Sequence, residues 1–170
     1  MNNLYLVGMM GSGKSVTGKK LAALLQCGFV DLDQWIEDRY HRSINEIFEK
    51  EGEPFFRDAE AGLLKEASGA GPRVVATGGG TVLRRENVTL MRGTGKIVFL
   101  ETSPDMLWER VKHKKDRPLL KGLDPQGKLR QIFSSRQSFY EQACDFKVNT
   151  DGQTAEVVAE KILQELRRQS

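Results

Sequence analysis

The first residues that could do chemistry lie between Gly8 and Ser15, where the sequence reads GMMGSGKS after an apolar segment at 4–7. Glycines in such a turn let successive backbone N–H groups point into one concavity, where phosphate oxygens can accept from them. Lys14 can bridge the β- and γ-phosphates, and the Ser15 hydroxyl can coordinate Mg²⁺. Because a strand-like segment precedes the motif and a helix-like one follows, it indicates a nucleoside triphosphate site rather than a turn without a ligand. The residues expected to contact the nucleotide here are Gly11, Ser12, Gly13, Lys14, Ser15 and Val16.

Two acids follow the next apolar segment, in the sequence Asp31-Leu32-Asp33. If the strand continues to Asp33, its alternation places both carboxylates on one side. One acid can then hold the Mg²⁺ shell through water, and the other can accept a proton from an attacking hydroxyl. An isolated pair of this kind is more often a solvated acidic turn, and only the nearby phosphate motif favours the catalytic interpretation.

A basic residue and a glycine run suggest a second ligand. Arg57 and Glu60 are three residues apart and share one face of a predicted helix, which could also be a plain surface ion pair. Gly78, Gly79 and Gly80 end a predicted buried strand. Three glycines cost chain entropy unless the backbone must approach something closely, so a ligand beside them is the simpler explanation.

The composition is that of one globular domain. The chain has 170 residues, 39% of them hydrophobic, and 26 basic against 23 acidic side chains, which gives a net charge of +3. This charge does not argue for nucleic-acid binding, and no apolar run reaches the ~20 residues that span a bilayer. We therefore expect a cytoplasmic protein without nucleic-acid or membrane partners, monomeric because no apolar surface stripe is evident. Cys27 and Cys144 are expected to be packing residues.

Strand-like and helix-like segments alternate along the chain. Strands are expected at 4–7, 29–31, 73–77, 96–100 and 146–148. A first helix is expected from Lys14 to a stop at Cys27-Gly28, a second starts at the capping-box residue Ser43, and a third covers 56–67. Three more are expected: one after Ser103-Pro104, a long one that follows the loop at 112–124 and ends at about Ala143, and a last one over 155–166. Residues 112–124 have no sustained period and are expected to form a mobile loop. This order predicts an α/β protein with a parallel sheet between helical layers.

These motifs together resemble the shikimate kinase family, in the family's order and over nearly the whole chain. The resemblance rests on GMMGSGKS, Asp31-Leu32-Asp33, SINEIFEKEGEPFFRDAE at 43–60, the glycine run, Arg110, Arg117-Pro118-Leu119-Leu120 and Arg136. It implies a three-layer α/β/α P-loop kinase fold with a central, mainly five-stranded parallel sheet. It also implies one domain over 1–170, a helical substrate-binding region at about 33–60 and a lid at about 112–124. The implied reaction is ATP-dependent phosphorylation of the 3-hydroxyl of shikimate.

The same resemblance implies a role for individual residues. Lys14, Asp33 and Arg117 would be catalytic, Ser15 and, through water, Asp31 would hold Mg²⁺, and ATP would be the phosphoryl donor. The residues implied for shikimate are Asp33, Phe48, Phe56, Arg57, Gly78, Gly79, Gly80 and Arg136, and those implied for the nucleotide beyond the phosphate motif are Arg110, Arg117 and Gln153. Glu60 would hold Arg57 or Arg136 in position.

Two alternatives remain at this stage. Another small P-loop kinase, for gluconate or a nucleotide, would have the same phosphate cradle with a different acceptor. The two arginines and the glycine run argue against it, because together they suit a small carboxylate. A non-catalytic nucleotide-binding module descended from such a kinase is the second alternative, and loss of an acid or an arginine would favour it. None of these residues is missing.

Overall fold

A parallel five-stranded sheet forms the centre of the computed structural model, which describes residues 2–114 and 118–169. The strands lie in the order β2-β3-β1-β4-β5, and all four strand pairs are parallel. Their bounds are β1 Asn3–Val7, β2 Gly28–Asp31, β3 Arg73–Ala76, β4 Gly95–Glu101 and β5 Phe146–Asn149. The predicted α/β architecture and all five predicted strands are confirmed.

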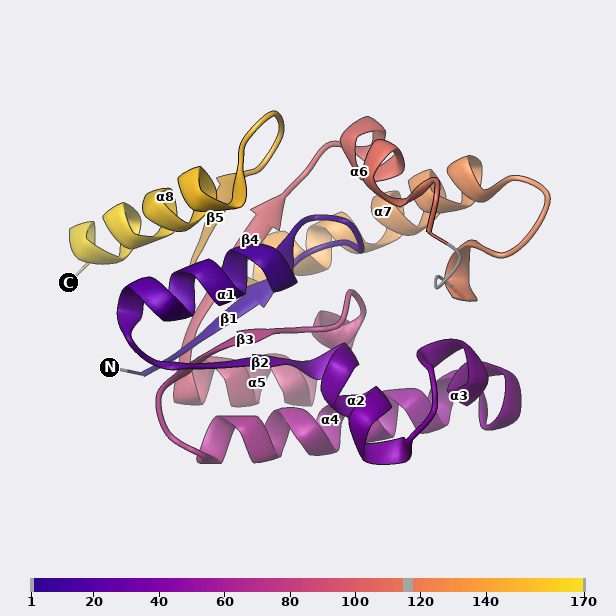
Figure 1. Ribbon diagram of the computed structural model, residues 1–170, viewed down its shortest axis with the longest axis horizontal. Helices are drawn as coiled ribbons and strands as arrows, with labels where there is room; N and C mark the ends of the chain where they lie inside the picture. Colours follow the sequence, from indigo (N-terminus) through magenta and orange to yellow (C-terminus); the bar gives the residue numbers. More distant parts are fainter. Residues whose placement is uncertain (1, 115–117, 170) are drawn as a thin grey trace.

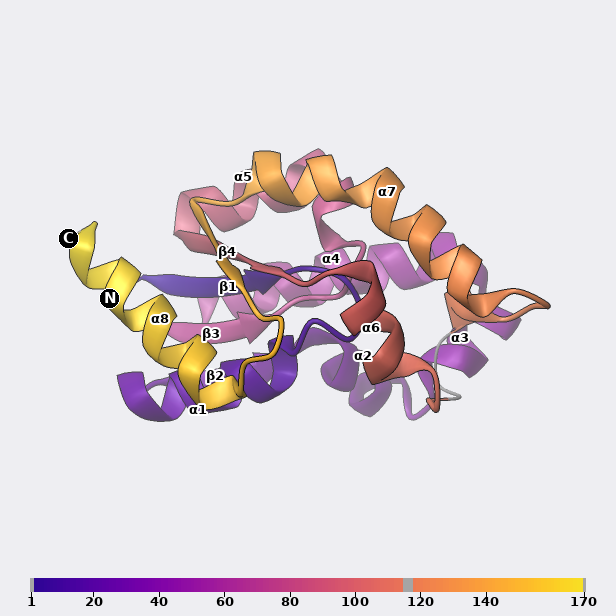
Figure 2. The same cartoon turned by 90° about the horizontal axis from the view of Figure 1, so that it is seen from above.

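Helices cover both faces of this sheet, as the two views in Figures 1 and 2 show. The α-helices are α1 Lys14–Leu25, α2 Leu32–Tyr40, α3 Ile44–Lys50, α4 Gly52–Gly69, α5 Arg85–Thr94, α6 Pro104–Val111, α7 Pro125–Ala143 and α8 Ala155–Arg168, with 3₁₀ turns at η1 Thr81–Leu83 and η2 Pro118–Leu120. In Figure 2, α5 and α7 lie on one side of the strands, and α1 and α8 lie on the other. The result is the expected three-layer arrangement.

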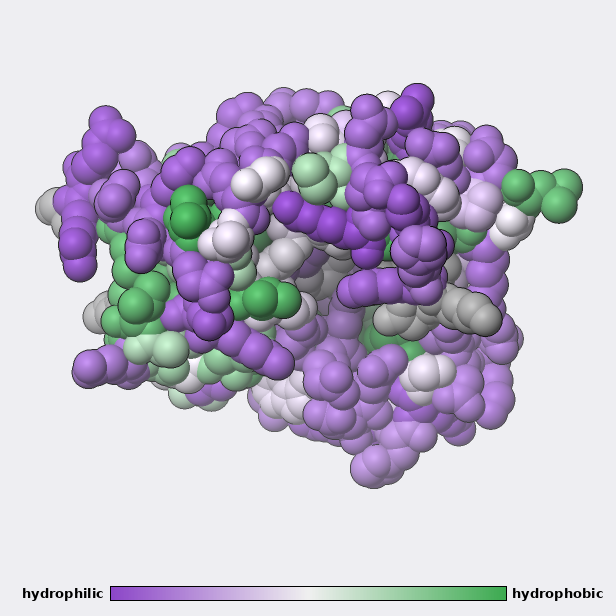
Figure 3. Space-filling model, turned by 45° about the horizontal axis from the view of Figure 1, so that its top comes forward, coloured by the Kyte–Doolittle hydropathy of each residue, from purple (hydrophilic) through white to green (hydrophobic). Residues whose placement is uncertain are grey.

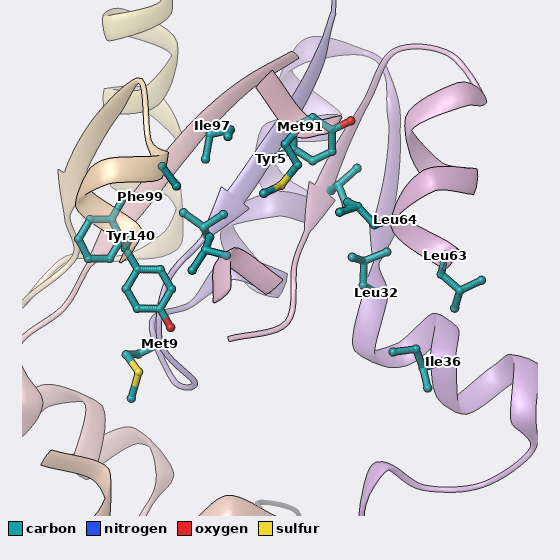
Figure 4. Packing of buried hydrophobic residues seen from close by; sticks show 14 of the residues in the cluster. Tyr5, Met9, Leu32, Ile36, Leu63, Leu64, Met91, Ile97, Phe99 and Tyr140 are labelled. Carbon is teal, nitrogen blue, oxygen red and sulfur yellow. The ribbon is translucent and has the colours of Figure 1, made fainter. Parts of the chain in front are cut away.

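Strand alternation divides the core into two apolar clusters. Tyr5 and Val7 of β1 face a large cluster that includes residues of α2, α4, α5 and α7, part of which is drawn in Figure 4. Leu4 and Leu6 face the opposite way, into a smaller cluster with α1 and α8. Because both faces are buried, β1 is apolar throughout rather than alternating, which is typical of a parallel sheet covered on both sides.

Several local expectations are wrong. The helices α2 and α5 were not predicted, and α4 begins at Gly52 and ends at Gly69, so it extends beyond the expected 56–67. The left-handed residue that ends α1 is Gln26, with φ 52°, and Gly28 instead begins β2. The N-caps at Ser43 and Ser103 are confirmed, the first as a complete capping box.

The strand argument for the two acids is also wrong. Asp31 is the last residue of β2, but Asp33 already belongs to the first turn of α2. The Asp31 carboxylate caps this helix, because its Oδ1 accepts from the backbone N–H groups of Asp33 at 3.1 Å and Gln34 at 3.3 Å. A helix cap competes with strand continuation at this position, and the cap determines the observed structure.

Candidate functional site

A cleft of about 640 Å³ opens where the carboxyl ends of β1, β2 and β3 meet. Figure 3 shows a hollow near the centre of one face, surrounded mostly by hydrophilic residues. The predicted site residues that line the cleft are Gly11, Ser12, Gly13, Lys14, Ser15, Val16, Asp31, Asp33, Phe48, Phe56, Arg57, Gly78, Gly79, Gly80, Arg110, Arg136 and Gln153. Only Arg117 among the predicted site residues is not placed, because it lies outside the described residues. Parallel strands thus bring together segments more than 140 residues apart.

The phosphate-motif turn has the backbone that an anion cradle needs. Gly11 and Gly13 have φ values of 81° and 91°, which a residue with a Cβ adopts only with strain. The helix α1 begins directly afterwards, so its positive end faces the turn. Lys14 Nζ donates to the carbonyl oxygens of Gly8 at 2.8 Å and Met9 at 2.9 Å. The turn and the lysine therefore already have the compact form in which a phosphate can be surrounded by N–H groups.

Residues at the start of α1 and at the end of β2 fit a magnesium ion. The Ser15 hydroxyl donates to Oδ2 of Asp31, so the two predicted metal-site side chains are in direct contact. Mg²⁺ prefers hard oxygen ligands, and it is usually bound by one or two protein groups together with phosphate oxygens and water. Ser15 and Asp31 together offer a hydroxyl and a carboxylate oxygen of this kind.

Arg57 is held at the other end of the cleft by two carboxylates. Its Nη1 lies 3.0 Å from Oε2 of Glu60, and its Nη2 lies 3.0 Å from Oε1 of Glu53. The Glu60 side chain is fully buried and also accepts from the Thr81 hydroxyl at 2.5 Å. Burial lowers the pKa of Arg57, but the charges of Glu60 and Glu53 outweigh this effect and leave the pKa raised. The expected support of Arg57 by Glu60 is confirmed.

Two of the three positions in the glycine run, Gly78 and Gly80, have no space for a side chain. A Cβ on Gly78 would overlap Oε1 of Glu60 and would lie 3.1 Å from Oδ1 of Asp33. A Cβ on Gly80 would overlap the guanidinium group of Arg57. Gly79 lies between the nucleotide and acceptor ends of the cleft, since its Cβ position is 3.6 Å from both the Met10 nitrogen and Nη1 of Arg136. The glycines therefore let two charged side chains and the phosphate turn approach the same backbone.

Two phenylalanines form an apolar wall beside Arg57. Phe48 of α3 and Phe56 of α4 have ring centroids 4.9 Å apart at an interplanar angle of 46°. The Arg57 guanidinium carbon lies 5.1 Å from the centroid of the Phe56 ring. An apolar surface next to a fixed cation is suited to a small ring that carries a carboxylate.

Arg110 of α6 lines another part of the cleft. Its Nη2 donates to the backbone oxygen of Thr150 at 3.0 Å, and its Nη1 donates to the Gly11 oxygen at 3.2 Å. These bonds join α6 to the phosphate turn and to the segment after β5. Gln153 also lines the cleft, and its Oε1 is buried without a hydrogen-bond partner within the described residues. A donor group on a bound base could satisfy this oxygen.

Two residues that the sequence analysis did not single out, Tyr140 and Thr81, form hydrogen bonds to groups of the site. Tyr140 lies four residues after Arg136 on α7 and donates to the Gly79 carbonyl oxygen at 2.5 Å. Thr81 immediately follows the glycine run and bonds to Glu60. The helical spacing from Arg136 was the available signal for Tyr140.

Fold and site together define a P-loop kinase of a small, negatively charged acceptor. The family model described as shikimate kinase matches residues 10–167. A shikimate kinase of Thermodesulfovibrio yellowstonii is 42% identical over 170 residues, covering 100% of this chain and 98% of that protein. The corresponding values for a shikimate kinase of Cupriavidus pinatubonensis are 41% over 164 residues, with 96% and 85% covered. The chain belongs to the shikimate kinase family.

Solved structures agree with this assignment. The structure of the shikimate kinase from Acinetobacter baumannii in complex with shikimate has a TM-score of 0.97 and 36% sequence identity. The match covers 100% of this chain and 95% of that chain. A gluconokinase from Sinorhizobium meliloti, covering 99% and 97% of the two chains, reaches a TM-score of only 0.59 at 19% identity. A deoxyadenosine kinase from M. mycoides has a TM-score of 0.64 at 16% sequence identity, and the match covers 98% of this chain and 100% of that chain. The last two likenesses show a shared fold alone.

The glycine run allows a test of the Arg57 position. Gly80→Ala should raise the KM for shikimate about 10- to 100-fold, because the new methyl group displaces the Arg57 guanidinium and small misplacements at a binding site have effects of this size. The KM for ATP should change little, since Arg57 is on another element. Steady-state kinetics with each substrate varied in turn measures both values.

The matched control is Gly62→Ala on α4, where no heavy atom other than those of the neighbouring helix backbone lies within 4 Å of the new Cβ. This variant should keep both KM values. If Gly80→Ala also kept the parental KM for shikimate, the overlap with Arg57 would have no consequence for the acceptor.

Proposed function

We propose that this cleft transfers the γ-phosphoryl group of ATP to the 3-hydroxyl of shikimate, giving shikimate 3-phosphate and ADP. The observation that carries the proposal is the buried Arg57, fixed by Glu60 in the same cleft as the phosphate turn. A cation held in this way suits the substrate carboxylate, which its planar guanidinium can bind with two parallel hydrogen bonds. Arg136 lines the same cleft and would be the second carboxylate ligand.

Asp33 is proposed to act on the acceptor hydroxyl. Its carboxylate lies beside Gly78, at the junction between the phosphate turn and the shikimate end. The 3-hydroxyl oxygen would form a bond to the γ-phosphorus while the bond from that phosphorus to the bridging oxygen of ADP breaks. The hydroxyl proton would pass to the Asp33 carboxylate. Orientation and proton acceptance by one group explain why an acid is needed at this position.

The phosphate end is proposed to neutralise the moving charge. Lys14 would exchange its bonds with the loop carbonyls for bonds to the β- and γ-phosphates, and the loop N–H groups would bind the β-phosphate. Ser15 and, through water, Asp31 would hold Mg²⁺, which supplies positive charge next to the phosphate oxygens. Arg117 stays a sequence-based prediction as a further cation at the phosphoryl group.

The nucleotide base is proposed to bind at the opposite end, where Arg110 and Gln153 line the cleft. The segment around 112–124 is proposed to serve as a lid, and its described residues Lys114, Pro118 and Leu119 border the cleft. Closure of such a segment would exclude water, which otherwise competes as the acceptor.

The chain is proposed to work as a cytoplasmic monomer on the path to chorismate and the aromatic amino acids, without nucleic-acid or membrane partners. No helix in 2–114 or 118–169 combines the length and apolar character of a membrane span.

The direct test compares acceptors. ADP release measured by a coupled assay should be rapid with shikimate and at background level with gluconate and with nucleoside monophosphates. Gluconate has a carboxylate but no ring to pack on the apolar wall of Phe48 and Phe56, and a nucleoside monophosphate has a phosphate and a larger base in place of a small ring with a carboxylate. Faster turnover with gluconate or a nucleotide would overturn the proposed acceptor. No turnover with any of them would favour a non-catalytic nucleotide-binding module.

The role of Asp33 is tested by Asp33→Asn, which keeps the shape and removes the proton acceptor. We expect kcat to fall roughly 10²- to 10⁴-fold, the usual contribution of a positioned general base, with a smaller change in the shikimate KM. Asp38→Asn, an exposed acid on the same helix, should leave kcat unchanged. An unaltered kcat in Asp33→Asn would remove Asp33 from the chemical step.

Arg57→Ala should weaken shikimate binding at least about 30-fold, because truncating one member of a desolvated charge pair costs about 2–5 kcal/mol. Affinity for ATP should stay near the parental value. Calorimetry should also show that an amide analogue of shikimate binds the parent poorly and that the variant no longer distinguishes it from shikimate. Full discrimination in the variant would show that Arg57 does not bind the carboxylate.

Two further variants control this experiment. Arg84→Ala removes a half-buried arginine that pairs at 2.7 Å with Asp58, which lies on the same helix as Arg57, and it should leave shikimate binding unchanged. Arg57→Lys keeps a charge beside the buried Glu60 and so guards against loss of folding. It should still bind shikimate more weakly than the parent, because an ammonium group lacks the planar fork.

A further inference from the structure

A buried tyrosine that takes no direct part in the proposed reaction lies next to the glycine run. Tyr140 of α7 is fully buried, and its ring stacks on Phe99 of β4 with a centroid distance of 5.1 Å and an interplanar angle of 20°. Figure 4 shows the two rings lying side by side. The ring is thus fixed against the sheet, and only the hydroxyl group reaches the glycine run.

Each carbonyl of the glycine run accepts a hydrogen bond. The Gly78 oxygen accepts from the backbone of Thr81 at 3.3 Å, and the Gly80 oxygen accepts from the backbone of Leu83 at 3.0 Å. The middle carbonyl, that of Gly79, accepts from the Tyr140 hydroxyl at 2.5 Å. The first two bonds belong to the local 3₁₀ turn. The third is the only one of the three made by a side chain, and it comes from a helix 61 residues further along the chain.

The N–H groups of Gly79 and Gly80 differ from these carbonyl groups. No hydrogen bond from the N–H groups of Gly79 or Gly80 occurs within the part of the chain that the structure describes, although both residues line the cleft. In a trans peptide the N–H of Gly80 points opposite to the carbonyl of Gly79. Fixing the carbonyl towards Tyr140 therefore fixes the Gly80 N–H away from α7. Because Gly80 lines the cleft, a ligand acceptor there can accept from this N–H group.

We propose that the Tyr140 hydroxyl is a positioning residue for the acceptor: it orients the Gly79–Gly80 peptide so that the Gly80 N–H can donate to shikimate. This inference rests on the proposed function, and it adds the group that orients the backbone donor. Arg136 belongs to the same arrangement, because it lies one turn before Tyr140 and its Nη1 is 3.6 Å from the Cβ position of Gly79. The helix α7 thus positions both the Arg136 cation and, through Tyr140, the Gly79–Gly80 peptide for binding of the acceptor.

The hydroxyl is suited to a permanent donor role. Burial raises the pKa of Tyr140 to about 12, although the nearby Arg136 lowers it in part. The proton therefore stays on the hydroxyl over the whole working range of a kinase. The Gly79 carbonyl can accept only from a protonated hydroxyl, so the peptide orientation does not depend on pH in that range.

Tyr140→Phe tests this role, since it keeps the ring against Phe99 and removes only the hydroxyl. The KM and Kd for shikimate should rise about ten-fold, corresponding to one lost hydrogen bond that leaves its partner unsatisfied. The KM for ATP and the kcat at saturating shikimate should stay within about two-fold of the parent. This split separates positioning of the acceptor from general damage to the fold.

Tyr5→Phe is the matched control. Tyr5 is also fully buried, and its hydroxyl bonds to Ser68 at 2.8 Å and Thr94 at 2.7 Å near the amino end of β1, away from the cleft. Thermal unfolding should show that this variant loses stability as Tyr140→Phe does, while its shikimate KM stays parental. Equal effects of the two variants on the shikimate KM would reduce Tyr140 to a structural role and overturn the inference.

A spectroscopic measurement keeps the inference testable if kinetics are affected by stability. In ¹⁵N-glycine-labelled parent protein, the Gly80 amide resonance should shift on addition of shikimate, and in Tyr140→Phe this shift should be much smaller. An equal shift in both proteins would show that the hydroxyl does not orient the peptide. The parent enzyme is assayed first with shikimate, so failure of the proposed function is seen there and is distinct from failure of the Tyr140 role.

Discussion

The site depends on one buried carboxylate. Glu60 is fully buried and makes its bonds to Arg57 and Thr81, so it joins α4 to the turn that follows β3. A charge at this depth is tolerated only when it is paired and hydrogen-bonded, and removing one partner is strongly unfavourable. Gly78 must lack a side chain because Glu60 occupies that space. The position of Arg57, the glycine at position 78 and the attachment of Thr81 to α4 all follow from the placement of this carboxylate.

Sheet topology brings this acceptor end to the phosphate turn. β1 pairs with β3 along Leu4 to Leu6, and the two strands run in the same direction, so the loops that follow them leave the same edge side by side. One loop is the phosphate turn and the other is the glycine run, and Gly79 lies next to Met10 as a result. The donor and acceptor sites are therefore neighbours because of strand order.

The sequence predicted those parts of the molecule in which local pattern and tertiary structure agree. The five apolar strands, the phosphate turn and the caps at Ser43 and Ser103 are such cases. α2 was missed because only Leu32 and Ile36 of its nine residues are buried, and because Asp31-Leu32-Asp33 satisfies strand alternation as well as a helix cap. Tyr140 was missed for a different reason: its spacing from Arg136 indicates a shared helix face, but its bond to a carbonyl group 61 residues earlier exists only in the folded chain.

The two ends of the cleft differ in how far they are prepared for a ligand. Arg57 is already bonded to carboxylates on its own helix, and these bonds can persist while its remaining donors meet a substrate carboxylate. Lys14 instead donates to the carbonyl oxygens of Gly8 and Met9, which are bonds that a phosphate must replace. Preorganised groups lose little freedom on binding, whereas a group that exchanges partners gains only the difference between the two sets of bonds. It follows that the acceptor end should derive selectivity from a nearly fixed geometry. The phosphate end should instead gain its strongest interactions as negative charge shifts on the nucleotide, which is where catalysis of phosphoryl transfer requires them.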